Sequence, residues 1–421
     1  MVKRVLMIAF HFPPQRGSSG IQRTLKFCRY LPASGWQPTV LTAHPRAYAD
    51  TASDQLGDIP DNVEVHRAFA LDTARHLSFK RRYASIMALP DRWVSWCFGA
   101  LPTGLRLIRT LRPAVLWSTY PIASAHLIAL ALHRLTGIPW VADMRDPMTG
   151  PDYPADALTR RVYHWIETKT VMHCARLVCT TPGAIRSYQR RFPALPPERF
   201  CLIENGYDEE NFTDAVAHNV PVRSTAKQFV LLHSGIIYPS ERDPVPFFRA
   251  LACLLEQKRI SSATLQVILR APVHDAYLDA LIREHGIETI VSIAPHIPYR
   301  EALAEMLGAD GLLILQAANC NQQIPAKLYE YLRAGRPILA LTDAAGDTAA
   351  TLRKAGIDTI AALDQTEHIM AALMQFLAMA ESGTAPLASF AASRANSRNA
   401  RSIELANLLD SVVAEANARA R

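Results

Sequence analysis

The sequence has no apolar run long enough to cross a membrane as a helix. Such a helix needs roughly 18 or more apolar residues, and the longest candidate in the 421 residues, from 122 to 132, is interrupted by His126. The shorter run Val5–Phe10 is followed by His11 and two prolines rather than a small-residue cleavage site, so it predicts a β-strand and not a signal peptide. We therefore expect a cytoplasmic protein, or one that sits at the inner face of the membrane.

Patterns typical of metal, disulfide and nicotinamide chemistry are also missing. The seven cysteines are odd in number and none has C-x-x-C spacing, so neither a zinc site nor a disulfide framework is indicated. No D-x-D pair occurs, and the G-x-G-x-x-G fingerprint of nicotinamide binding is absent. We expect no bound metal and no cofactor.

What the chain does have is an excess of positive charge. Its 45 Lys and Arg against 38 Asp and Glu give a net charge of +7. This excess favours an acidic partner, such as a diphosphate, an anionic membrane surface or nucleic acid. Because no RNA- or DNA-binding module is visible, nucleic acid is the least favoured of the three.

Apolar, β-branched runs alternate with helical patterns along the chain, which predicts parallel sheets built from βαβ units. Two such series indicate two doubly wound domains, residues 1–214 and 226–395, joined by an aperiodic linker at 214–228 and followed by a helical tail at 396–421. The expected strands lie near residues 5–10, 38–42, 63–68, 115–118, 140–144, 177–180, 201–204, 229–233, 265–269, 289–293, 311–315, 338–341 and 359–362.

The stretch Gln316–Thr342 carries the strongest chemical signal. Its pattern predicts a polar loop, a short helix and a strand, directly after an apolar strand. Pro325 suits the first helical position, and Gly335 suits the left-handed position after the helix. Lys327 in the first turn and Glu330 on the same face suit a nucleotide-sugar: the cation reaches a diphosphate and the carboxylate accepts ribose hydroxyls. The plain alternative is a surface helix with a Lys–Glu pair.

The string IPAKLYEYLRAGRPILAL resembles the donor-binding segment of the retaining GT-B glycosyltransferases of family 4. The resemblance implies that Glu330 grips the ribose, that Ile324, Pro325 and Leu328 belong to the donor site, and that residues 316–323 influence sugar choice. The family often has a glutamate eight residues before this one. Gln322 stands there instead, and it can hydrogen-bond a sugar or phosphate but cannot act as a carboxylate.

A second part of the donor site is expected where the chain reads LLHSGIIYPSERD. Strand, Gly235, Arg242 and then a helix is the order of a phosphate site, and many relatives have Gly-Arg with a lysine downstream. An arginine can bridge phosphate oxygens in a bidentate manner, so Arg242 preserves the task. The alternative for Arg242 is a surface salt bridge with Glu241 or Asp243.

Two segments of the first half match the acceptor or sugar side of the family. The loop HFPPQRGSSG contains His11, Gly17 and Ser18, although a plain Gly-Ser turn explains it equally well. The string DMRDP contains Asp143, Arg145 and Asp146, and follows a strand, so it opens at the carboxyl edge of the sheet. For these three charges a structural ion-pair cluster is an equally strong interpretation.

Residues 79–112 combine Lys80, Arg81, Arg82 and Arg92 with Trp93, Trp96, Phe98 and Leu101. Basic residues beside aromatic ones are typical of a peripheral membrane contact. A helix whose aromatic side faces the core is the slightly favoured alternative.

Together these features predict a GT-B fold: two Rossmann-like doubly wound domains that face each other across a cleft, with a C-terminal helix that crosses back to the first. We expect a hexosyl- or N-acetylhexosaminyltransferase that acts with retention, takes a nucleoside-diphosphate-sugar as co-substrate and serves a polysaccharide or lipid-linked acceptor. Arg242, Lys327 and Glu330 are the expected catalytic residues. A GT-B nucleotide-sugar epimerase, with His11, Asp143 and Asp146 as acid–base groups, and a non-catalytic nucleotide-sugar-binding partner are the alternatives.

Overall fold

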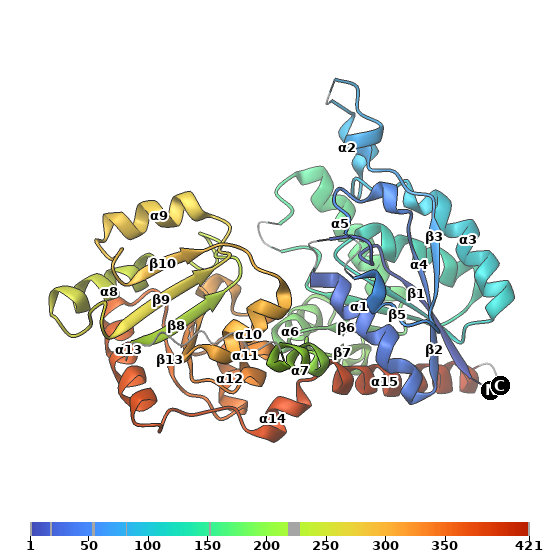
Figure 1. The fold of residues 1–421 in the computed structure, drawn as a ribbon. Coiled ribbons are helices and arrows are strands. Elements are labelled where there is room, and N and C mark those ends of the chain that lie inside the picture. Colours follow the sequence, from blue (N-terminus) through green and yellow to red (C-terminus); the bar gives the residue numbers. More distant parts are fainter. Residues whose placement is uncertain are drawn as a thin grey trace. The chain divides into compact units, whose positions relative to one another are not determined.

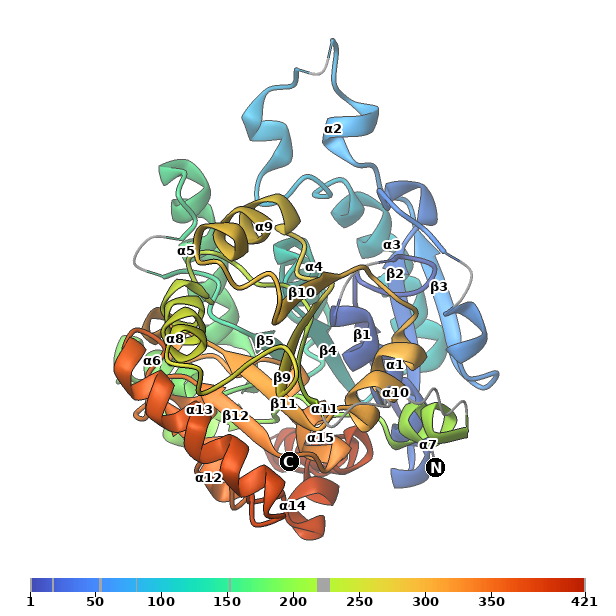
Figure 2. The same cartoon turned by 60° about the vertical axis from the view of Figure 1, so that its left-hand side comes forward.

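The computed structural model describes residues 2–16, 19–52, 55–80, 82–150, 153–217 and 228–419. The chain forms two compact units (Figures 1 and 2). The first comprises Met1–Glu204 and Arg398–Arg421, and the second comprises Asn205–Ser397. Each has a parallel sheet covered by helices on both faces, so the predicted pair of doubly wound α/β domains is confirmed.

The first unit is built on a seven-stranded sheet in the order β3-β2-β1-β4-β5-β6-β7. Every adjacent pair is parallel. The strands are β1 (Lys3–Ile8), β2 (Trp36–Ala43), β3 (Glu64–Ala68), β4 (Val115–Thr119), β5 (Trp140–Arg145), β6 (Arg176–Cys179) and β7 (Phe200–Leu202).

Alternate side chains of β1 enter two separate cores, because successive residues of a strand point to opposite faces. Val5 and Met7 pack with α1 and α15, whereas Leu6 and Ile8 pack with the helices of the other face. Since α15 follows the second unit in sequence, the expected return of the C-terminal helix to the first domain is confirmed. The helices are α1 (Ser19–Tyr30), α2 (Thr73–His76), α3 (Trp96–Leu111), α4 (Ala123–Thr136), α5 (Ala157–His173), α6 (Pro182–Arg191) and α15 (Arg398–Arg419).

The second unit has a six-stranded sheet in the order β10-β9-β8-β11-β12-β13. Leu313 and Leu315 of β11 enter one core, and Leu312 and Ile314 enter the other. The strands are β8 (Phe229–Ser234), β9 (Leu265–Arg270), β10 (Val291–Ala294), β11 (Gly311–Leu315), β12 (Ile338–Leu341) and β13 (Ile360–Ala361). The helices are α7 (Glu209–Ala217), α8 (Val245–Glu256), α9 (Asp275–Glu284), α10 (Tyr299–Gly308), α11 (Lys327–Ala334), α12 (Asp347–Lys354), α13 (Thr366–Glu381) and α14 (Phe390–Ala395).

The boundary between the units lies ten residues before the position expected from the sequence, at Glu204 rather than 214. The physical reason is α7, whose Phe212 and Ala215 are buried in the second unit's core together with Tyr207. An apolar helix face belongs with the core that covers it, so α7 is part of the second unit and not of a linker. Of the predicted linker, residues 218–227 lie outside the described residues.

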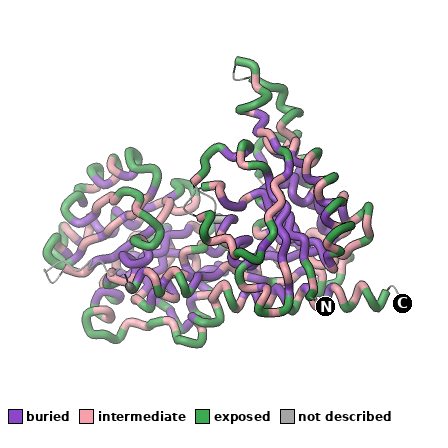
Figure 3. Tube along the Cα trace, turned by 45° about the vertical axis from the view of Figure 1, so that its right-hand side comes forward, coloured by how far each residue is buried: buried purple, intermediate pink, exposed green. Residues whose placement is uncertain are grey.

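Strand order reverses between β1 and β4 in the first sheet and between β8 and β11 in the second. Ligands of open α/β sheets bind outside the carboxyl ends of the strands at such a reversal. The central strands of both sheets are buried, whereas the exposed residues lie mainly on helices and loops (Figure 3). In the part of the chain that the structure describes, no helix is both long and apolar enough to pass through a bilayer.

Candidate functional site

The stretch after β11 folds as the sequence predicts, with one correction at the helix start. A loop containing a 3₁₀ turn (Ala318–Cys320) leads into α11, and Gly335 ends the helix in the left-handed region at φ 65°. The helix begins at Lys327 and not at Pro325. The amides of Leu328 and Tyr329 bond the carbonyls of Pro325 and Ala326 at 2.9 and 3.3 Å, so a tight turn precedes the α-helical pattern.

One buried amide holds the loop in place. The Nε2 group of Gln316, which is 3% exposed, donates to the carbonyls of Cys320 at 2.8 Å and Gln323 at 2.9 Å. The next amide, Ala317 N, bonds the carbonyl of Glu241 at 2.7 Å, which ties this loop to the one that follows β8. The loop is therefore fixed from both of its sides before any ligand arrives.

Lys327 reaches from α11 to the end of β8. Its Nζ donates to Nε2 of His233 at 2.9 Å, while Nδ1 of His233 donates to the carbonyl of Leu313 at 2.9 Å. The imidazole is therefore neutral, with its proton on Nδ1, and burial together with the Lys327 charge lowers the pKa of His233 well below its usual value. Gly235, at φ 100°, leaves room for the ammonium: a Cβ there would lie 3.4 Å from Nζ.

Arg242 supplies a second cation beside the first. Its guanidinium donates to the carbonyl of Ile236 and stacks on Tyr238, with 5.3 Å from Cζ to the ring centroid. The alternative of a salt bridge to Glu241 or Asp243 is not observed among the described residues.

These two cations repel each other. Burial, followed by the charge of Arg242, lowers the pKa of Lys327 well below its usual value, and the more distant Glu330 offsets this only in part. Neither cation has a carboxylate within ion-pair distance among the residues that the structure describes. An anion bound here would supply the missing negative charge.

Glu330 lies one turn further along α11 and is half-buried. The hydroxyl of Tyr299, at the start of α10, donates to its Oε1 at 2.6 Å. The helix is held to β8 by the next residue, because the amide of Ser234 donates to the hydroxyl of Tyr331 at 2.9 Å. The orientation of the Glu330 carboxylate is therefore fixed by Tyr299, and the position of its helix by Tyr331.

The other residues predicted to bind the donor differ in how far they are buried. Leu328 and Ile324 are buried in the core beneath α11, so they position the helix and the loop through packing. Gln322 is exposed in the loop. The donor roles of Gly235, Gln322, Ile324, Pro325 and Leu328 stay predictions.

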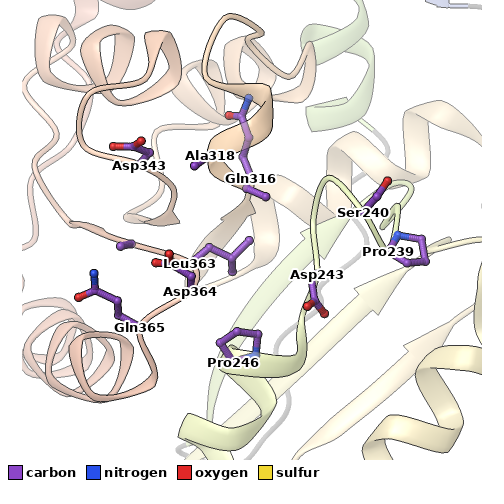
Figure 4. A pocket seen from close by; sticks show the side chains of 12 residues that line it. Pro239, Ser240, Asp243, Pro246, Gln316, Ala318, Asp343, Leu363, Asp364 and Gln365 are labelled. Carbon is purple, nitrogen blue, oxygen red and sulfur yellow. The ribbon is translucent and has the colours of Figure 1, made fainter. Parts of the chain in front are cut away.

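A cavity of about 440 Å³ adjoins the loop on the same unit. Carboxylates from three loops surround it, Asp243, Asp343 and Asp364 (Figure 4). No group of His, Cys, Asp and Glu in the described ranges is arranged to hold a metal ion. The lining is Pro239, Ser240, Asp243, Pro246, Gln316, Ala317, Ala318, Asp343, Ala362, Leu363, Asp364 and Gln365.

In the first unit, Asp143 forms a complete ion pair. Arg23 of α1 donates from Nε and Nη2 to the two carboxylate oxygens, both at 2.9 Å, and the hydroxyl of Thr119 adds a bond of 3.0 Å. Arg23 also donates to the carbonyls of Ile203 and Glu204 at 2.9 and 3.0 Å. Since Asp143 is fully buried and both of its oxygens are used, the structural interpretation holds for this residue.

The other first-unit candidates lie nearby. Arg145 has φ 59° at an irregularity of β5, and burial lowers the pKa of its guanidinium. Burial, with the Arg145 charge, lowers the pKa of His11 to about 4. Asp146 lies next to Arg145 and is exposed. Gly17 and Ser18 fall outside the described residues.

Sequence reasoning missed four residues that organise these sites. They are His233, Tyr299 and Tyr331 in the second unit, and Arg23 in the first. His233 could have been found from the sequence, because it stands at the end of an apolar strand, directly before Ser234 and Gly235. Nothing local marks Arg23, whose partner lies 120 residues away.

The comparisons with known proteins agree with this geometry. Residues 19–206 match the family model described as glycosyl transferase 4-like domain. No curated protein matches the sequence.

Solved structures match over nearly the whole chain. Sucrose-phosphate synthase from Thermosynechococcus elongatus is 13% identical, with a TM-score of 0.70 over 98% of this chain and 100% of its own. Anabaena HepE in complex with UDP-glucose is 13% identical, with a TM-score of 0.65 over 97% and 99%. UDP-GlcNAc 2-epimerase from Neisseria meningitidis, bound to UDP-GlcNAc, is 9% identical, with a TM-score of 0.55 over 96% and 99%.

At these identities the structural matches establish the fold, and the family model matches most of the first unit. Residues 19–206 thus resemble the glycosyl transferase 4-like domain, in a chain that has the GT-B fold.

Proposed function

We propose that this GT-B glycosyltransferase moves a sugar from a nucleoside-diphosphate-sugar to an acceptor hydroxyl with retention of configuration. The observation that carries the proposal is the pair Lys327 and Arg242, whose hydrogen bonds go to a neutral imidazole and to a backbone carbonyl, while burial and then the charge of Arg242 lower the pKa of the lysine. A diphosphate supplies the negative charge that this position lacks. HepE, which shares the fold, has been solved with UDP-glucose, and this supports the same class of donor here.

The two cations have a role beyond binding. As the glycosidic bond breaks, negative charge develops on the departing diphosphate. Preorganised donors aimed at developing charge contribute roughly 2–4 kcal/mol each to lowering the barrier. Lys327 is held by His233 and Arg242 by the carbonyl of Ile236, and these bonds fix both cations before a donor binds.

Glu330 is assigned to the ribose of the donor. A carboxylate accepts hydrogen bonds from two adjacent hydroxyls, and Tyr299 fixes its orientation through Oε1. Gln322, exposed in the loop that Gln316 holds, is proposed to contact the sugar. The sugar is a hexose or an N-acetylhexosamine in this proposal, and the acceptor belongs to bacterial surface polysaccharide or glycolipid synthesis.

Retention is proposed to use the departing phosphate itself as the acceptor of the proton from the attacking hydroxyl, on the same face of the sugar. A dedicated protein base is then unnecessary. The first unit is consistent with this, because a histidine with a pKa of about 4 is a weak base at neutral pH and Asp143 is occupied by Arg23. The same two observations disfavour two of the three acid–base groups that an epimerase would use at the sugar ring, His11 and Asp143, and leave Asp146.

The test is a panel of UDP-, GDP-, ADP- and TDP-sugars, with slow donor hydrolysis and its anomeric outcome followed by NMR. The wild type is compared with Lys327→Ala and Glu330→Ala, and with Lys354→Ala and Glu367→Ala as matched controls on exposed helix positions of the same unit. We expect one donor to be hydrolysed with retention and only the first two variants to lose activity. Conversion of a donor to its epimer would establish the epimerase instead. Absence of binding to every donor would refute the proposal.

A further inference from the structure

A segment of the first unit stands away from its sheet. Residues 72–92 connect β3 to α3 and contain α2 and a 3₁₀ turn at Ser85–Ala88. In Figures 1 and 2 the part of the chain around α2 projects from the body of its own unit. All the residues from 82 to 87 are exposed. We call residues 72–92 the projecting segment.

The base of the projecting segment is firmly anchored. Asp72 is fully buried and accepts from Nε of Arg92 at 2.7 Å and from the amide of Ala74 at 3.0 Å. Asp91 accepts from the amides of Trp93 at 3.0 Å and Ser124 at 2.8 Å. Buried carboxylates with several partners fix a backbone strongly. The segment therefore begins and ends at defined positions on the fold.

The far end of the segment presents apolar side chains to solvent. Phe79 and Arg82 exchange two backbone hydrogen bonds of 2.8 and 2.9 Å, which closes a tight hairpin. Phe79 is 78% exposed and Ile86 is 71% exposed. Leu77, Tyr83 and Met87 are each about 40% exposed, at 41%, 40% and 41%. Five large apolar residues exposed within 11 positions mark an interaction surface.

The exposed charged side chains of the projecting segment are all positive among its described residues. Residues 72–92 contain five Lys and Arg and two Asp. Both aspartates, Asp72 and Asp91, are buried at the base and hydrogen-bonded there. Lys80 and Arg82 are exposed at the hairpin itself, and Arg75 is exposed on α2. The apolar tip is thus surrounded by cations, with no exposed carboxylate among the described residues of the segment.

We propose that the projecting segment docks the enzyme on an anionic lipid surface. Phe79 and Ile86 enter the boundary between headgroups and acyl chains, while Lys80 and Arg82 contact anionic headgroups. A second copy of the chain is a poor occupant, because a self-complementary contact through this surface brings cations against cations. The inference rests on the first unit alone and does not depend on the donor site of the second.

The structure also separates this surface from the core aromatics of the neighbouring helix. Trp96 is fully buried, and Trp93 is half-buried and donates from Nε1 to the carbonyl of Ala47 at 3.1 Å. Arg92 is engaged by Asp72. Of the basic and aromatic cluster seen in the sequence, these three residues serve the fold, Phe98 on α3 is 77% exposed, and the surface assigned to lipid lies around Phe79 and Lys80.

The test is co-sedimentation of the full chain with phosphatidylcholine vesicles, with and without phosphatidylserine. We expect binding that requires phosphatidylserine and weakens as salt rises, because exposed charges are screened. The double variant Phe79→Ser/Ile86→Ser should bind at least about tenfold more weakly, since two large apolar side chains lose their burial. Phe390→Ser, which changes an equally exposed phenylalanine of the second unit, is the matched control and should bind like the wild type.

A second variant and its control measure the contribution of charge separately from that of the apolar side chains. Lys80→Glu/Arg82→Glu should lose the preference for phosphatidylserine, while Arg249→Glu on the exposed side of α8 should keep it. Circular dichroism and nucleotide-sugar binding check that each variant is folded. The proposal fails if the wild type ignores anionic vesicles, or if the serine variant binds them as the wild type does. A lipid-independent dimer that the serine variant disrupts would instead assign the surface to a second copy.

Discussion

Two charged sites of this protein use arginine in opposite ways. In the first unit, Arg23 gives two hydrogen bonds of 2.9 Å to Asp143, and the pair is buried and complete. In the second unit, Arg242 lies near another cation, Lys327, which donates its hydrogen bond to a neutral imidazole. An arginine paired with a carboxylate of the same chain stabilises the fold. Two cations that lie together without a carboxylate are typical of a binding site for an anion. The following predictions test this contrast.

The largest effect is expected from breaking the complete pair. Asp143→Ala leaves Arg23 buried without its carboxylate, and the loss of one partner of a buried ion pair costs about 3–5 kcal/mol. Urea unfolding should show this loss in the first unit. Donor binding by the folded variant should stay unchanged, and a variant of wild-type stability would show that the pair has no structural role.

The next effect concerns the incomplete pair. Lys327→Ala and Arg242→Ala should each lower kcat/KM by roughly 30- to 1,000-fold, which corresponds to about 2–4 kcal/mol of transition-state stabilisation. Steady-state kinetics with the identified donor measure it, with Lys354→Ala and Arg249→Ala as matched controls. A loss below about threefold in both site variants would mean that the cations are not aimed at the leaving group.

In the ligand-free protein, removing the charge of Lys327 should have the opposite effect on stability from removing the charge of Asp143. Because burial and Arg242 lower the pKa of Lys327, its charged form is disfavoured in the fold. Replacement by the uncharged Lys327→Met should therefore raise the Tm of the ligand-free protein, where Asp143→Ala lowers it. Scanning calorimetry at neutral pH decides this, and a lower Tm for Lys327→Met would show that the lysine is stabilising in the absence of donor.

Donor affinity should depend on pH through the same lysine. A diphosphate favours the protonated form, so affinity is highest below the lowered pKa of Lys327 in the free protein and falls as pH rises through it. A nucleotide-sugar is suitable because both of its phosphates are esterified and neither titrates near neutral pH. Calorimetric titrations over a pH series should show the fall in the wild type and a flatter profile in Lys327→Met.

A smaller effect is expected at the ribose. Tyr299→Phe removes the bond of 2.6 Å to Glu330 and leaves the carboxylate in place. The loss of one hydrogen bond to a charged group costs about 1.5–3 kcal/mol at most, and less here because Tyr299 is 44% exposed. Donor affinity should fall by about tenfold or less. An effect larger than that of Glu330→Ala would contradict the positioning role of Tyr299.

The sequence was sufficient to predict every strand of both sheets. Most of the runs that form these strands are apolar and short, and this pattern is local. The helix carrying Lys327 and Glu330 was predicted for the same reason. Its start was wrong by two residues, because the carbonyls of Pro325 and Ala326 close a turn that no residue preference reveals.

Features that depend on distant contacts were not predictable in this way. The partner of Asp143 is Arg23 on α1, and the partner of Lys327 is His233 on β8. The unit boundary was misplaced because Phe212 packs into a core formed by residues far along the chain. Exposure of Phe79 and burial of Trp96 are likewise properties of the folded chain, since both belong to one basic and aromatic stretch of sequence.

The most direct test of the central claim is calorimetric titration of the UDP-, GDP-, ADP- and TDP-sugar panel into the wild type and into Lys327→Met, with Lys354→Met as the control. The account predicts that one nucleotide-sugar binds the wild type and the control equally well, and that Lys327→Met binds it at least about tenfold more weakly. Equal affinity for all three proteins, or no binding by any of them, would contradict the claim that the uncompensated cations of the second unit hold a diphosphate.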